Sequence, residues 1–122
     1  MDWVNKHLQI VPINTFIDPI FPVENAIITH AHADHAKPGH NNVLATKHTI
    51  EIMKIRYGEN CANNFQELSF NSPLNINGVN VTFFPAGHIL GSAQVLLEYQ
   101  KDKINFGDFM EEKINKKYKI NF

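Results

Sequence analysis

Short apolar segments alternate along the chain with turn-forming residues, and this pattern predicts a set of β-strands. The predicted strands cover residues 14–17, 25–29, 42–46, 79–84, 93–99 and 103–106. Most are bounded by proline, glycine, asparagine or aspartate, which favour turns. The pattern therefore indicates a protein that is rich in short strands.

One stretch between the third and fourth strands follows a helical period instead. Residues 47–60 read "KHTIEIMKIRYGEN", in which Ile50, Met53 and Tyr57 recur at the spacing of one helix face. Gly58 is a plausible end of this helix. The sequence therefore predicts one main helix and an α+β fold.

Two turn sequences predict how the later strands pair. "NING" at residues 75–78 precedes the fourth strand, and "QKDK" at residues 100–103 joins the last two. Both are typical of hairpin turns, which connect antiparallel neighbours. We therefore expect a single mixed, largely antiparallel sheet.

Length and composition limit the class of protein. A chain of 122 residues with 43% hydrophobic residues can bury one modest core, so we expect one domain or part of one. The net charge of −1 gives no basic excess of the kind that nucleic-acid binding proteins carry. The single cysteine, Cys61, excludes an internal disulfide framework and a zinc site built on paired cysteines.

The sequence carries no signal for membrane insertion. The start "MDWVNKHLQI" lacks the charged and apolar regions of a signal peptide. No apolar run approaches the roughly 18 residues of a membrane span. We therefore expect a cytoplasmic protein with no membrane partner.

Several predicted strands run into an acidic residue or a histidine. Asp18 follows the first strand, His30 and His32 follow the second, His88 comes shortly after the fourth, and Asp108 follows the last. Polar side chains at strand ends are a common way for a rigid sheet to hold a functional site at its edge. We expect these residues to converge.

The densest group of candidate ligands lies in "IITHAHADHAKPGH", residues 27–40. Strand alternation would place His30 and His32 on one side, and Asp34 with His35 would join them if the chain is turning there. Imidazole and carboxylate without thiolate suit zinc, manganese or iron, and we predict zinc.

Structural roles compete with ligation at each of these positions. A lone histidine is commonly a surface or buried core residue, and Asp34 could cap a helix. The clustering favours a metal site for the motif. We expect His7 and His48 to be surface or helix residues, and His40 remains ambiguous, with a ligand role less favoured.

The stretch "THAHADHA" resembles the signature of the metallo-β-lactamase superfamily. "FPAGHILGSAQVLLE" resembles its β-CASP nucleases. "FIDPIFPVENAIITHAHADHAKPGH" followed by "ATKHTIEIMKIRYGE" is similar to bacterial ligase-associated DNA exonucleases, relatives of mRNA 3′-end-processing factors. The resemblance covers about residues 13 to 109. It implies the N-terminal half of an αββα sandwich and zinc-dependent phosphodiester hydrolysis of DNA or RNA.

The resemblance also implies ligand roles. Three residues would hold one zinc, namely His30, His32 and His88. Asp34 and His35 would contribute to a second zinc. A metal pair of this kind activates water for attack on phosphorus.

Further positions match carboxylates of the family. Asp108 matches the residue that bridges the two metals, and Asp18 matches one that lies behind the ligands and orients them. We assign the catalytic roles to Asp34 and Asp108. Gly87 and Gly91 would permit close backbone approach around His88.

Departures from the family pattern limit the expected activity. No histidine follows His88, although the family has a further ligand there. We therefore expect one tightly bound zinc and a weak second site. Residues 1–122 are interpreted as a partial metallo-β-lactamase domain, namely its first sheet and metal-binding loops without the second half or the β-CASP domain. We expect this part to be weak or inactive alone, and either marginally stable or self-associated through exposed sheet surface.

Two other functions remain open. One is a small-molecule hydrolase of the same superfamily that acts on a lactam, lactone or thioester. The other is a catalytically incomplete metal-binding protein, completed by a partner chain.

Overall fold

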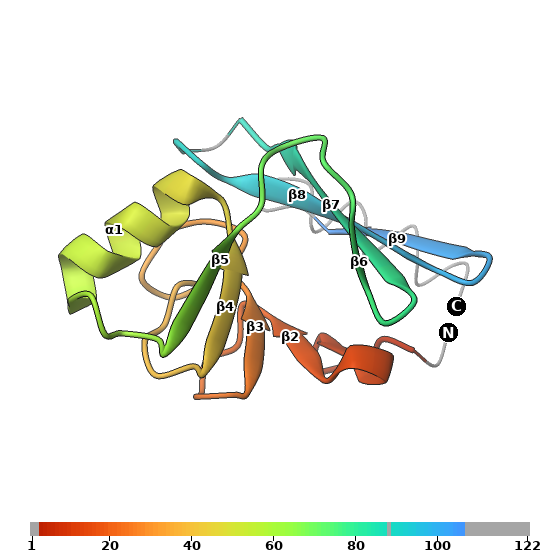
Figure 1. Ribbon diagram of the computed structural model, residues 1–122, viewed down its shortest axis with the longest axis horizontal. Coiled ribbons are helices and arrows are strands. Elements are labelled where there is room, and N and C mark those ends of the chain that lie inside the picture. The colour runs from red at the N-terminus through yellow and green to blue at the C-terminus, as the bar shows by residue number, and fades with distance from the viewer. Residues whose placement is uncertain (1–2, 88, 107–122) are drawn as a thin grey trace.

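The computed structural model describes residues 3–87 and 89–106, and His88 and Asp108 lie outside this range. The described residues form nine strands, one short 3-10 helix and one α-helix (Figure 1). In chain order they are β1 Gln9–Ile10, η1 Val11–Ile13, β2 Thr15–Ile17, β3 Asn25–Ile27, β4 Asn42–Ala45, α1 Lys47–Tyr57, β5 Asn64–Glu67, β6 Leu74–Ile76, β7 Val79–Pro85, β8 Ala93–Tyr99 and β9 Asp102–Phe106.

The strands form two sheets. The first has the order β1-β2-β3-β4-β5, with β1 antiparallel to β2 and all the other neighbours parallel. The second has the order β6-β7-β8-β9 and is antiparallel throughout. The strands therefore form two sheets where one was expected. The expected mixed and largely antiparallel pairing holds over both, because the first sheet is mixed and the second is antiparallel throughout.

Both predicted hairpins are present. β6 and β7 are joined at Asn77 and Gly78, whose φ angles of 45° and 94° are the left-handed values that a tight hairpin turn requires. β8 and β9 are joined at Gln100, with φ 56°. Turns encoded by short local sequences thus specify two of the three strand pairs of the second sheet.

Packing divides the molecule into three layers. Ile27 and Leu44 point from the first sheet into a core shared with the second sheet, whereas Ala26 and Val43 point to the opposite face, against α1. This alternation is the two-residue period of a strand that is buried on both faces. The layers are helix, sheet and sheet, and the α+β fold class is confirmed (Figure 1).

Helix α1 forms as its sequence predicts. Ile50 and Met53 are buried beneath it, and Gly58 follows its last residue. Thr46 is its N-cap, because its side-chain oxygen accepts a hydrogen bond from the backbone N–H of Thr49. Thr46, predicted as the end of a strand, thus begins the helix instead.

Three strands were absent from the sequence prediction: β1, β5 and β6. β1 has two residues, and β5 reads "NFQE", a largely polar edge strand with no clear alternation. Such strands form because a neighbour supplies hydrogen bonds, which a local pattern does not show.

Neither helix in residues 3–87 and 89–106 has the length and apolar character of a transmembrane span.

Candidate metal centre

The parallel strands β2 and β3 bring the predicted acid and histidines to one edge of the first sheet. Asp18 directly follows β2, and His30 lies three residues beyond β3. Parallel neighbours end at the same edge, so loops that follow them meet there. Asp18, His30 and His35 each offer one ligand atom, and these atoms all lie within 4.8 Å of one another.

Asp18 is the centre of a hydrogen-bond network. Its Oδ1 accepts from the backbone N–H of Thr29 at 2.7 Å, and its Oδ2 accepts from Thr29 Oγ1 at 2.6 Å and from His35 Nδ1 at 2.9 Å. Its backbone has φ 48°, a left-handed conformation that costs free energy for a residue other than glycine. Its backbone N–H donates to Ile27 O, which fixes this turn against β3.

The network determines the tautomers of two histidines. The Thr29 hydroxyl has one hydrogen and gives it to Asp18, so the same oxygen accepts from His30 Nδ1, 2.8 Å away. His35 Nδ1 likewise donates to the Asp18 carboxylate. In the neutral ring, the lone pair of His30 and of His35 then resides on Nε2. This is the protonation pattern of a histidine whose Nε2 ligates a metal.

The three imidazoles of the motif lie together. The ring centres of His30 and His32 are 4.9 Å apart, and those of His30 and His35 are 4.2 Å apart. Strand alternation is not the reason, because β3 ends at Ile27 rather than at residue 29. A turn brings His35 back, since the N–H groups of His35 and Ala36 both donate to His32 O.

Burial differs sharply within the cluster. His30 is fully buried, and the side chains of Asp18, His35 and Asp34 are 10%, 30% and 79% exposed. Asp34 Oδ2 lies 3.7 Å from His35 Nε2. The cluster is therefore buried at His30 and open to solvent at Asp34, as a site that admits a ligand must be on one side.

Residues 89–93 are bonded to α1 and to Thr29, beside the cluster. Gly91 O accepts hydrogen bonds from the hydroxyls of Thr46 and Thr49, and Ala93 N–H donates to Thr29 O. Ser92 is buried and its Oγ accepts from the backbone N–H of Ile89, a structural role within the loop. The predicted ligands His88 and Asp108 lie outside the described residues.

The remaining histidines occupy different environments. His7 and His48 are exposed, and His48 lies on α1, as the sequence predicts. His40 is buried, and its Nδ1 accepts from the backbone N–H of Val23 at 3.1 Å. This hydrogen bond requires an unprotonated Nδ1, so His40 is part of the loop structure.

The pKa of His40 makes the stability of the metal-free chain depend on pH. Burial lowers its pKa from the ordinary value of 6.5. The unfolded chain therefore binds more protons near that pH, and stability must fall as pH decreases through 6.5 toward the lower pKa of the folded chain. We expect urea unfolding to show this decrease and His40→Gln to reduce it. His7→Gln is the exposed control, and equal slopes in both variants would contradict the assignment.

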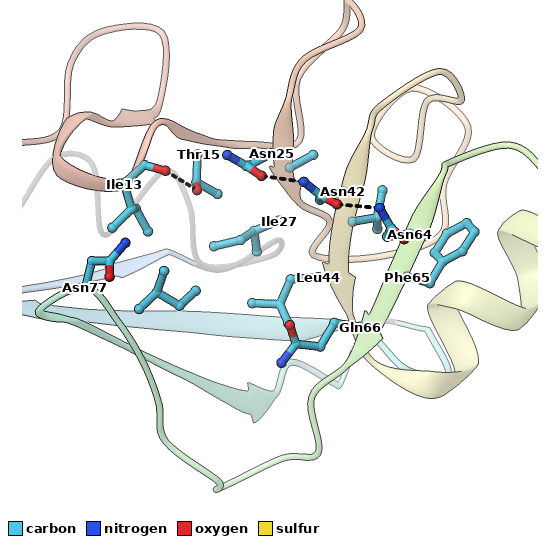
Figure 2. A pocket seen from close by; sticks show the side chains of 13 residues that line it. Ile13, Thr15, Asn25, Ile27, Asn42, Leu44, Asn64, Phe65, Gln66 and Asn77 are labelled. Carbon is cyan, nitrogen blue, oxygen red and sulfur yellow. Dashed lines mark hydrogen bonds between the residues drawn. The ribbon is translucent and has the colours of Figure 1, made fainter.

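A cavity of about 670 Å³ lies away from this cluster, at the opposite ends of the parallel strands. Figure 2 shows the asparagine ladder at its wall, in which Asn64 donates to Asn42 and Asn42 donates to Asn25, both at 2.9 Å. These residues are in register on β3, β4 and β5. Because the amides bind one another, the ladder holds the parallel strands in register.

Sequence reasoning missed two residues that contact the motif. Thr29 links Asp18 to His30, and Arg56 of α1 donates to Ala31 O at 2.6 Å. Thr29 directly precedes the histidines, so its hydroxyl was a visible signal. Arg56 lies 25 residues away along the chain, and no local pattern connects it to the motif.

Comparisons with known proteins add a sequence relation. No family model matches the chain. A probable DNA ligase of Opitutus terrae is 32% identical over 92 residues, which are 75% of this chain and 9% of that protein. Zn²⁺-bound PqqB from Methylobacterium extorquens matches 67% of this chain and 37% of its own chain, with a TM-score of 0.49 and 12% identity. The chain thus spans 9% of the length of its curated relative.

Proposed function

We propose that this chain contributes the metal-binding part of a zinc-dependent hydrolase that cleaves phosphodiester bonds in nucleic acid. The observation that carries the proposal is the network Asp18, Thr29, His30 and His35, which assigns an Nε2 lone pair to two histidines of one motif. In this proposal His30 and His32 act with His88 on one metal. Asp34, His35 and Asp108 belong to a second.

The residues fit a catalytic zinc. Imidazole nitrogens and a carboxylate are typical zinc ligands, and a site open to solvent leaves a position for water. Bound zinc would lower the pKa of that water toward neutrality and supply hydroxide. Asp18 would hold His35 in the ligating tautomer, and Asp34, exposed beside His35, would present its carboxylate on the solvent side of the site.

Two observations favour nucleic acid as the substrate. The resemblance of the motifs to β-CASP nucleases and ligase-associated exonucleases concerns the residues of the cluster itself. The relative in Opitutus terrae is described as a probable DNA ligase, and its match covers 75% of this chain. Membership of the metallo-β-lactamase superfamily and of its β-CASP branch is part of this proposal.

A hydrolysis assay tests the proposal. With zinc in excess, we expect weak turnover of bis(p-nitrophenyl) phosphate and of end-labelled DNA or RNA strands, and none of nitrocefin or a thioester. His32→Ala should reduce turnover to background, whereas His48→Ala, an exposed helix position, should leave it unchanged. Nitrocefin or thioester turnover alone would favour the small-molecule hydrolase. Tight zinc binding with no turnover would favour the incomplete metal-binding protein.

A further inference from the structure

Helix α1 packs against the histidine motif through Ile50 and Met53, and it also donates a side-chain hydrogen bond to the motif's backbone. Arg56, in the last turn of α1, donates from Nη1 to Ala31 O at 2.6 Å. Ala31 lies between His30 and His32, outside any strand, and is 2% exposed. A buried backbone carbonyl requires a donor. Among the residues that the structure describes, Arg56 supplies it.

The guanidinium is itself held in place on the helix surface. Its Cζ lies 5.7 Å from the centre of the Tyr57 ring, a cation–π distance. Arg56 is exposed as a whole, and these two contacts restrict the directions that its guanidinium can take. The contact therefore fixes the carbonyl, and with it the direction in which the chain leaves His30.

The other end of α1 contacts the second loop of the candidate centre. Thr46 Oγ1 and Thr49 Oγ1 donate to Gly91 O at 2.6 and 3.3 Å. One rigid helix thus contacts both the backbone between His30 and His32 and the backbone at Gly91. A helix changes length little, so these two contacts fix the distance between the loops.

We propose that Arg56 is a positioning residue of the metal centre, which holds the carbonyl between His30 and His32 so that both imidazoles keep one orientation toward the metal. This inference rests on the proposed metal-binding function. It assigns no contact between Arg56 and the metal. The effect is transmitted through the backbone of Ala31.

Zinc affinity, measured by competition with a chromophoric chelator, tests the inference. We expect Arg56→Gln to weaken zinc binding by about tenfold or more, as loss of an outer support of a metal ligand does. Arg56→Lys keeps the charge and should recover part of the affinity. Lys54→Gln is the matched control, since Lys54 lies in the same turn and pairs with Glu59 at 3.6 Å. It should leave zinc affinity unchanged.

Two further measurements separate positioning from general weakening of the helix. The absorption spectrum of bound Co²⁺ should change in Arg56→Gln and not in Lys54→Gln, because it reports ligand geometry. Amide hydrogen exchange in residues 29–36 of the metal-free chain should accelerate in Arg56→Gln alone. Unchanged affinity and spectrum in Arg56→Gln would overturn the inference, as would equal losses of affinity and melting temperature in both variants.

The proposed hydrolysis of nucleic acid can be refuted independently of the role of Arg56. A wild-type chain that binds zinc and shows the Arg56 effects, yet hydrolyses no phosphodiester, would refute nucleic-acid hydrolysis and leave the role of Arg56 intact. A wild-type chain that binds no zinc would overturn both.

Discussion

Asp18→Asn is expected to weaken zinc binding by about 10- to 100-fold, although the two side chains have nearly the same shape. Oδ1 of the asparagine can still accept from the Thr29 N–H, as in the native chain. The amide nitrogen would replace Oδ2, the atom that accepts from Thr29 Oγ1 and His35 Nδ1. An acceptor of two hydrogen bonds thereby becomes a donor.

The consequence is a change of tautomer in two rings. His35 Nδ1 would have to accept from the amide, which moves its proton to Nε2. Thr29 Oγ1 would also accept from the amide and would donate its hydrogen to His30 Nδ1, so His30 too would carry its proton on Nε2. In both rings the proton must then move from Nε2 back to Nδ1 before Nε2 can bind a metal.

Chelator competition measures the affinity, and two-bond ¹H–¹⁵N correlation spectra of the metal-free chain report the tautomers. Thr29→Val is the matched variant, because it removes the link to His30 and leaves the contact between Asp18 and His35 in place. We expect it to lose less affinity than Asp18→Asn. Native zinc affinity in Asp18→Asn would show that Asp18 does not orient the ligands.

Gly91→Ala is expected to destabilise the chain by about 2–5 kcal/mol. Gly91 has φ +84°, and a left-handed conformation costs a residue with a Cβ roughly 1–2 kcal/mol. A Cβ there would also lie 2.7 Å from His48 Cβ and 3.2 Å from the backbone N of Thr49. Relief of that overlap would cost about 1–3 kcal/mol more.

A matched Gly87→Ala variant separates the steric overlap from the conformational cost. Gly87 has φ +75°, and a Cβ there would meet nothing within 4 Å, so Gly87→Ala pays the conformational cost alone. Urea unfolding of both variants in the absence of metal gives the difference directly. Domains are typically stable by about 5–15 kcal/mol, so Gly91→Ala could leave the chain partly unfolded. Equal stability of the two variants would contradict close packing of Gly91 against α1.

The chain-local signals predicted much of the architecture. The helix from Lys47, its end at Gly58, the strands β2, β3, β4, β7, β8 and β9 and both hairpin turns follow from spacing and turn chemistry, which depend on neighbours in sequence. The strands β1, β5 and β6 and the division into two sheets did not follow. Pairing partners and packing faces decide these features, and both lie far apart along the chain.

For the candidate site, the sequence by itself determined which chemistry is available: imidazoles and carboxylates concentrated between His30 and His35, with Asp18 at a strand end. Only the tertiary structure decided how they act together. The parallel pairing of β2 with β3 carries Asp18 to Thr29 and His35, and α1 carries Arg56 to Ala31. A hydrogen bond can select the tautomer of a histidine or the orientation of a carbonyl only when donor and acceptor are within bonding distance. The fold determines that distance, because these residues are far apart along the chain.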